Sequence, residues 1–354
     1  MKKGFFATVA MVLTACMLLG CCMTAAVAED STTWHLGICI HSMNNEYWAQ
    51  EAAGAQLFAS QHDDIEAEVL TCDSDDNKQL QGMKDFIAKY GDKAIFVVDP
   101  SSTANTVNIA ELCEESGNYV TILAHREEGL FPSDFQYFVA SLQLSDYDNG
   151  YKTAVALFES IGGKGQVAEL QGKLGDDSAV NRHKGFEAAA ANYPDIEVVD
   201  SQTASWDQAQ AMTLTENWIV KYPEIAAVYA SNDTMALGAI EALTTVGKNG
   251  TVKVCGCDGT EAALNAVLSG DMLCTIANDG YNICGYGAAY SYYAATGVLD
   301  LSTMEGANRL IYCKTTFVDS SNVADIIDKF IVKGNPGYDY SDLAACIDSY
   351  QVVE

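Results

Sequence analysis

Short apolar runs alternate with amphipathic segments along the first part of the chain. Each run has the length of a buried strand, and each following segment repeats its apolar residues at the spacing of one helix face. The predicted strands cover 36–40, 67–71, 94–98, 120–123 and 137–142, and the predicted helices between them cover 47–60, 77–90 and 104–116. Alternation of this kind is typical of parallel strands covered by helices on both faces of a sheet.

The same alternation starts again after residue 142. The second set comprises a helix from 147, a strand at 166–170, a helix at 179–192, and strands at 197–200, 226–230 and 253–257. The sequence therefore predicts an α/β fold with two doubly wound, parallel-sheet (Rossmann-like) lobes and a crevice between them. Because the chain has only 5 Pro and no low-complexity linker, we expect short crossovers to join the lobes.

The stretch from Ala226 to Thr260 combines this pattern with candidate chemistry. Its first strand ends in the polar residues Ser231, Asn232 and Asp233, and its second strand ends in Asp258. Ligands of open parallel sheets bind at the carboxyl ends of the strands, so Asn232 and Asp258 are candidate ligand-binding residues. Helix capping is the alternative role for both, and position alone favours neither role.

The N-terminal segment has the pattern of an export signal. Two lysines precede an apolar run at 5–19, which is too short to cross a membrane comfortably. The sequence Leu18-Leu19-Gly20-Cys21 resembles the lipobox of bacterial lipoproteins, in which the cysteine thiol is acylated, whereas Ala26-Val27-Ala28 fits ordinary signal cleavage. We expect residues 1–20 to be the signal and 21–33 a tether, with the exported chain anchored to the membrane through Cys21, on the cell surface or in the periplasm.

Charge and size narrow the class of protein. The formal net charge of −29 would repel phosphate backbones, which excludes nucleic acid as a partner. A strongly acidic surface favours a soluble monomer. A mature chain of roughly 330 residues is too long for one ordinary core, which agrees with two domains.

The 12 cysteines give little indication of a metal or disulfide framework. Most lie in apolar runs, where cysteine behaves as a small hydrophobic residue, so we interpret them as buried free thiols. Cys255 and Cys257 face one side of a strand, but no further thiol or imidazole follows at ligand spacing. The acidic segment 73–77 lacks the glycine and terminal glutamate of a calcium loop. We therefore expect no metal and no cofactor.

Polar and aromatic residues collect at the predicted strand ends of both lobes. Carboxylates, guanidinium groups and amides together satisfy a hydroxyl group, which both donates and accepts hydrogen bonds. Flat aromatic rings suit the apolar C–H faces of a sugar. Four of the histidines are interpreted as solvated or capping residues: His35, His41, His62 and His183.

Seven segments in order resemble the type I periplasmic binding proteins for ribose, galactose and related sugars, which serve ATP-driven importers. The segments span roughly 34–318 and read HSMNNEYW, VVDP, AELQGKLGDDSAVNRHKGF, SQTASWDQAQAM, SNDTMALGA, CGCDGT and TIAND. The resemblance implies two lobes joined by a three-crossover hinge that closes on a sugar, and delivery of that sugar to a permease. It implies a first lobe at 34–140 plus 279–310 and a second at 141–278 plus 311–354. It places ligand contacts at Asn45, Tyr47, Trp48, Asp99, His125, Arg126, Arg182, Trp206, Asn232, Asp258 and Asn278.

Departures from the family pattern leave the ligand open. Ribose binders usually carry Phe where this chain has Tyr47, Trp48 and Trp206, and Asp where it has His125. Trp206 resembles the glucose and galactose binders, but their calcium loop is missing here. The sequence predicts a hexose or pentose, with a polyol or inositol as the alternative.

The sequence disfavours functions of other classes. Asp99 and Asp258 could form the acid and base pair of a glycosidase. However, two arginines between the lobes should hold both carboxyl groups ionised, so we expect that the protein is not an enzyme. A transcriptional regulator of this fold would need a DNA-binding segment where the export signal stands. A chemosensory receptor as partner, in place of a permease, stays open.

Overall fold

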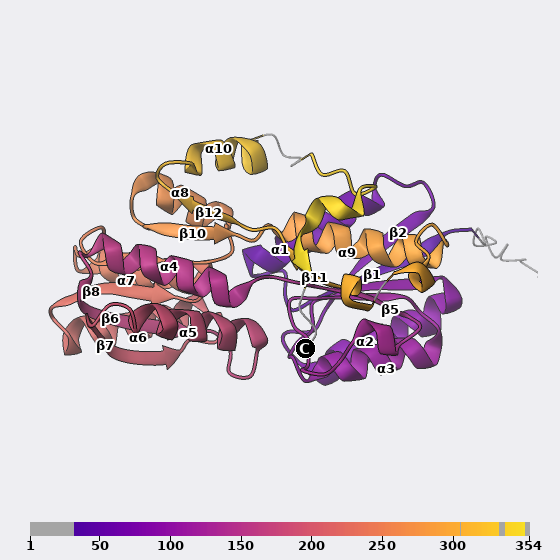
Figure 1. Cartoon of the computed structure of the whole chain (residues 1–354), viewed down its shortest axis with the longest axis horizontal. Helices are drawn as coiled ribbons and strands as arrows, with labels where there is room; N and C mark the ends of the chain where they lie inside the picture. Colours follow the sequence, from indigo (N-terminus) through magenta and orange to yellow (C-terminus); the bar gives the residue numbers. More distant parts are fainter. Residues whose placement is uncertain (1–31, 305, 333–336, 351–354) are drawn as a thin grey trace, which may run out of the picture. The chain divides into compact units, whose positions relative to one another are not determined.

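The structure is a computed structural model that describes residues 32–304, 306–332 and 337–350 (Figure 1). The described residues from Trp34 onward form one compact unit. The expected export signal, both expected cleavage sites and the expected lipidation residue Cys21 lie outside the described residues. In the part of the chain that is described, no helix is both long and apolar enough to cross a membrane.

The first lobe is built on a seven-stranded sheet with the order β13-β11-β5-β4-β3-β1-β2. All neighbours pair in parallel except β13, which runs antiparallel to β11. The strands are β1 (Trp34–Ile40), β2 (Ile65–Thr71), β3 (Ala94–Val98), β4 (Val120–Leu123), β5 (Phe138–Gln143), β11 (Leu310–Cys313) and β13 (Ile347–Tyr350).

Helices cover both faces of this sheet because successive strand residues point to opposite sides. Leu36, Ile38 and Ile40 of β1 pack against α1 (Glu46–Ala59) and α9 (Gly280–Ala295). On the opposite face, Phe96 and Val98 of β3 pack against α2 (Asp76–Tyr90) and α3 (Asn105–Ser116).

The second lobe has a six-stranded sheet with the order β12-β10-β9-β8-β6-β7, parallel except for β12. Its strands are β6 (Lys164–Gln171), β7 (Asp195–Thr203), β8 (Ile225–Ala230), β9 (Lys253–Cys255), β10 (Cys274–Ala277) and β12 (Thr316–Asp319). One face packs against α6 (Gln208–Lys221), α7 (Asp233–Thr245), α8 (Glu261–Ser269) and α10 (Val323–Ile327), and the other against α4 (Asp146–Ser160) and α5 (Asp177–Ala190). The predicted fold class is confirmed.

The expected assignment of 311–354 to the second lobe is wrong for part of that segment. Strand β11 pairs with β5, and β13 covers the other edge of β11, so both strands belong to the first sheet. Tyr340 packs in the same core, with its ring against Tyr286 of α9. Of the described tail, β12 and α10 lie on the second lobe, and Ile331, in the turn that follows α10, packs against the same core. Strand β5 also continues to Gln143, past the expected boundary at 140.

Short helical turns link several of these elements. They are η1 (Gly91–Lys93), η2 (Pro132–Asp134), η3 (Leu301–Thr303), η4 (Gly306–Arg309), η5 (Asp328–Val332) and η6 (Leu343–Cys346). The described cysteines are buried free thiols, as the apolar runs around them predict.

Candidate functional site

A cavity lies between the two lobes, at the carboxyl ends of their central strands. The cavity has a volume of about 50 Å³. Its lining residues are His41, Asn45, Tyr47, Trp48, Asp99, Ala124, His125, Leu144, Ser178, Arg182, Trp206, Asn232 and Asp258.

The structure brings nine of the eleven predicted residues together in this cavity; the exceptions are Arg126 and Asn278. The Arg126 guanidinium turns into its own loop, where Nη1 donates to the Leu130 carbonyl oxygen at 2.8 Å and the group lies over the Phe131 ring. Asn278 is fully buried, and its amide contacts Cys257 Sγ at 3.3 Å. These two side chains do not line the cavity, and their expected role as ligand contacts stays a prediction.

Asp99 follows β3 and is the acidic centre of the first lobe's contribution. Its Oδ2 lies 3.7 Å from His41 Nε2, and its Oδ1 lies 3.9 Å from His125 Nε2. Burial acts to raise the pKa of Asp99, but His41 and then His125 outweigh it, so the net pKa is lowered. The carboxylate is therefore ionised, and its Oδ1 has no hydrogen-bond partner among the described residues.

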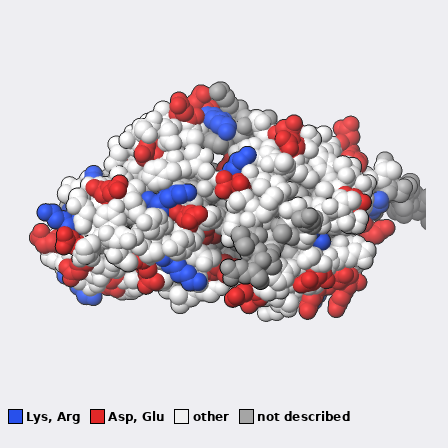
Figure 2. All heavy atoms as spheres, in the orientation of Figure 1, with Lys and Arg blue, Asp and Glu red and all other residues white. Residues whose placement is uncertain are grey.

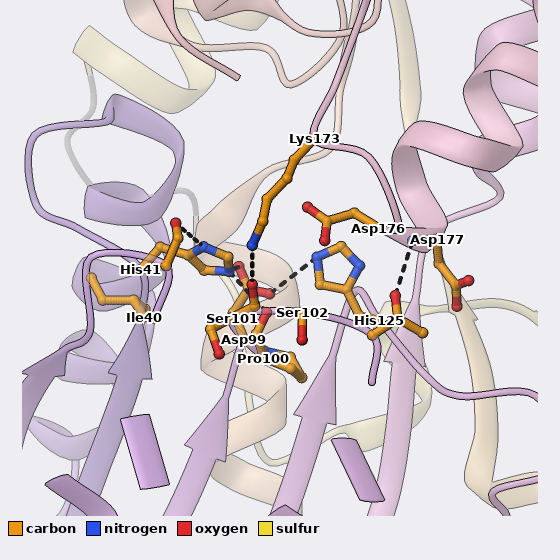
Figure 3. Close-up of polar contacts among 12 residues, drawn as sticks. Ile40, His41, Asp99, Pro100, Ser101, Ser102, His125, Lys173, Asp176 and Asp177 are labelled. Atoms are coloured by element: carbon orange, nitrogen blue, oxygen red, sulfur yellow. Dashed lines mark hydrogen bonds and ion pairs between the residues drawn. The ribbon is translucent and has the colours of Figure 1, made fainter. Parts of the chain in front are cut away.

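His41 is a buried member of the site, so its interpretation as a solvated or capping residue is wrong. The residue is 1% exposed, and its ring stacks on Trp48, with ring centroids 4.3 Å apart and planes 5° from parallel. Nδ1 bonds to Ser74 Oγ at 2.9 Å, and Nε2 donates to the Pro100 carbonyl oxygen at 2.9 Å (Figure 3). His41 thus positions both the carboxylate and the indole that border the cavity.

The ring nitrogens of His41 and His125 and the carboxylate of Asp99 lie close enough to raise the question of a metal ion. A carbonyl oxygen only accepts hydrogen bonds, so the Pro100 contact requires a proton on His41 Nε2. That nitrogen has no lone pair to offer a cation. The arrangement therefore fits a hydrogen-bonding group better than a metal centre.

Arg182 of α5 is the cationic centre of the second lobe's contribution. Its Nε donates to Asp146 Oδ1 at 2.7 Å, and Nη1 donates to the Ser231 carbonyl oxygen at 2.8 Å and lies 3.5 Å from Asp258 Oδ1. Burial raises the pKa of Asp258 well above its usual range, and Arg182 only partly opposes this. The expectation that two arginines hold both Asp99 and Asp258 ionised is therefore wrong, because histidines do so for Asp99 and Arg126 lies elsewhere.

Trp206 is fixed as an aromatic wall of the cavity. Its backbone has a φ of 64°, which non-glycine residues rarely adopt. Its indole Nε1 donates to Asp176 Oδ2 at 3.0 Å, and a Cβ at Gly172 would collide with its ring. A strained backbone held by side-chain contacts is common at ligand sites.

The family model described as "Periplasmic binding protein domain" matches residues 36–297. The chain belongs to this family. The xylitol-binding protein of Mycolicibacterium smegmatis is 32% identical to this periplasmic binding protein over 263 residues, which cover 74% of this chain and 72% of that protein. The ribose import binding protein of Escherichia coli is 31% identical over 255 residues, covering 71% and 80% of the two chains.

A solved structure is also similar to this chain in fold and in sequence. The twin-arginine translocation pathway signal protein from Burkholderia phytofirmans superimposes with a TM-score of 0.87 and 31% identity, covering 91% of this chain and 99% of that one. This periplasmic binding protein is thus a substrate-binding protein of the type I architecture, in a family of exported binding proteins.

Direct hydrogen bonds join the lobes of this periplasmic binding protein at two rims of the cavity. At one rim, Asn45 Nδ2 donates to Thr234 Oγ1 at 3.2 Å, and the Glu46 carboxylate accepts from the first backbone amide of α8. At the other rim, Lys173 Nζ donates to the Ser101 carbonyl oxygen at 2.7 Å (Figure 3). These bonds hold the lobes closed over the cavity.

Sequence reasoning missed several residues of the site. His41, Ala124 and Leu144 line the cavity and stand at or near the ends of β1, β4 and β5. The strand-end rule that selected Asn232 and Asp258 would have found them. Asp176 contacts the Trp206 indole, and this contact depends on the folded loop, which the linear pattern does not show.

Proposed function

We propose that this protein binds one monosaccharide, or a polyol of similar size, and delivers it to the permease of an ABC importer. The observation that carries this proposal is the ionised Asp99 on one side of the cavity and the Arg182–Asp258 pair on the other. A hydroxyl group both donates and accepts, so it can bridge a carboxylate and a guanidinium. Relatives named for xylitol and for ribose support this class of ligand.

The proposed ligand contacts are the nine predicted residues that line the cavity, together with His41. Trp48 and Trp206 would pack against the apolar C–H faces of the ligand, since both indoles are fixed by neighbouring side chains. Asn232 accepts a hydrogen bond from the Met235 backbone amide with Oδ1, which orients its amide nitrogen. A polar site of this kind rejects analogues that lack a hydroxyl, because its own buried groups would lose a partner.

We further propose that the exported chain is a lipid-anchored monomer that performs no catalysis. The lipobox-like sequence at Cys21 supports the anchor, and the strong negative charge supports the monomer. On the face drawn in Figure 2, the described acidic side chains are scattered and no continuous basic patch appears. A chemosensory receptor remains the alternative partner.

One observation favours a second function, a glycoside-processing enzyme. The pKa of Asp99 is lowered while that of Asp258 is raised, and such opposite shifts are typical of acid and base pairs. Because the matched family consists of binding proteins, we expect no reducing sugar to be released from chromogenic glycosides.

A thermal-shift panel of pentoses, hexoses, inositols and linear polyols tests the proposed function. A compound present at 100 times its dissociation constant should add about 2.7 kcal/mol of stability. Asp99→Ala should lose this shift, whereas Asp63→Asn, which neutralises an exposed carboxylate in a loop of the first lobe, should keep it. A panel in which no compound moves the melting temperature would contradict the proposal.

A further inference from the structure

Glu51 is a fully buried carboxyl group beside two residues of the cavity wall. It lies one turn after Tyr47 on α1 and has 0% exposure. Neither of its oxygens has a hydrogen-bond partner among the described residues, and the same holds for the Tyr47 hydroxyl and for Asp99 Oδ1. Buried polar atoms are rarely left unpaired, so this cluster calls for a physical explanation.

The titratable groups that face Glu51 come from four elements, and all of them are acidic or neutral. Tyr47 lies on the same helix, Asp99 follows β3, Asp258 follows β9 of the second lobe, and Cys284 lies on α9. The basic side chains of the site contact other groups. His41 and His125 flank Asp99, and Arg182 contacts Asp258 and Asp146.

Two buried carboxyl groups side by side cannot both be ionised without a large cost. Burial is the main reason that the pKa of Glu51 lies well above its usual range, and the negative charge of Asp99 is the next. Asp99 has two histidines and Glu51 has none, so Asp99 carries the charge and Glu51 keeps the proton. A protonated carboxyl group has an O–H to donate, which the acceptor-rich cluster otherwise lacks.

We propose that Glu51 is a positioning residue that must be protonated to hold Asp99 and Tyr47 in the closed site, so that ligand binding is linked to one proton. Closure excludes water from the cluster, which favours the protonated form. The closed state therefore binds this proton more tightly than the open state does. This inference rests on the proposed function and identifies a residue that does not line the cavity.

Titration calorimetry from pH 5 to pH 9, with xylitol, D-ribose and myo-inositol as probes, tests this linkage. The affinity of the native protein should fall as the pH rises, by at most about tenfold per pH unit for one proton. Glu51→Gln keeps the size and neutrality of the protonated side chain at every pH, so its affinity should vary less with pH. Glu216→Gln changes an exposed glutamate of α6 and should follow the native profile.

Two further measurements keep the inference testable without a comparison of affinities. Binding by the native protein should take up protons near neutral pH, seen as different heats in buffers of different ionisation enthalpy. In the unliganded protein, the Glu51→Gln variant should gain melting temperature relative to the native protein as the pH rises from 5 to 9. The reason is that a group with a raised folded pKa contributes its full stability only below its unfolded pKa, near ~4.3.

The outcomes separate this inference from the proposed function. If a probe binds but the native protein and Glu51→Gln share one pH profile, the inference is overturned and sugar binding stands. If binding takes up no protons, or the variant gains no melting temperature at high pH, the inference is also overturned. If no probe binds and no compound of the thermal-shift panel changes the melting temperature, both the inference and the proposed function are contradicted.

Discussion

Replacing Asp258 by alanine removes the second lobe's acidic group from the proposed site and leaves Arg182 anchored. The guanidinium keeps its 2.7 Å bond to Asp146 and its 2.8 Å bond to the Ser231 carbonyl oxygen. The change also removes a buried carboxyl group whose pKa is raised by burial. We therefore expect the unliganded variant to melt at or above the temperature of the native protein.

Ligand affinity should respond in the opposite way. A hydroxyl group that loses its buried partner costs about 1–3 kcal/mol, and each 1.4 kcal/mol is tenfold in affinity. Asp258→Ala should therefore weaken binding by roughly five- to 150-fold. Asp258→Asn should retain more affinity than Asp258→Ala, because an amide donates and accepts much as a neutral carboxyl group does.

Titration calorimetry of the two variants and of Asp63→Asn at one pH gives the affinities, and scanning calorimetry gives the melting temperatures. As the pH rises, Asp258→Asn should gain stability relative to the native protein, because stability tied to a raised folded pKa is lost in that direction. Native affinity in the Asp258→Ala variant would refute the placement of Asp258 in the site. Unfolding of Asp258→Ala would refute the energetic reasoning.

Three other predictions follow from packing and thiol geometry. A Cβ at Gly54 of α1 would lie 2.5 Å from Tyr281 Cα, so Gly54→Ala should lose about 1–3 kcal/mol of stability. The control is Gly82→Ala, whose added Cβ meets no atom within 4 Å, and this variant should melt at or above the native temperature. Asp176→Ala removes the acceptor of the Trp206 indole and should weaken binding by roughly fivefold, for a bond of about 1 kcal/mol; unchanged affinity in calorimetry would argue against a positioning role. Thiol titration of denatured, unreduced protein should find the nine described cysteines reactive, and a lower count would mean that disulfides form.

The fold could be predicted from the sequence because the local spacing of apolar residues indicates its parallel strands and its helices. The predicted helix at 77–90 and the observed α2 differ by one residue, and the strands at 94–98 and 120–123 coincide with β3 and β4. The tail could not be assigned in the same way. Whether β11 and β13 join the first or the second sheet depends on pairing with distant strands, which short-range patterns do not specify.

Much of the site could be predicted for a similar reason, since strand ends in a parallel sheet converge on one edge. The directions of side chains in loops could not. Arg126 lies two residues after Ala124, where a φ of 53° turns the chain, and the Arg126 guanidinium contacts its own loop. The electrostatic roles of His41 and Glu51 depend on burial and on neighbours far away in sequence, which the linear pattern does not show.

The most direct test of the central claim is a calorimetric titration of the native protein and of Asp99→Ala with each sugar and polyol of the panel. We predict saturable binding of at least one compound to the native protein, with one molecule bound per chain. Asp99→Ala, still folded by its melting curve, should lose this binding. Heats of dilution alone for every compound with the native protein, or native affinity in Asp99→Ala, would contradict the proposed sugar site.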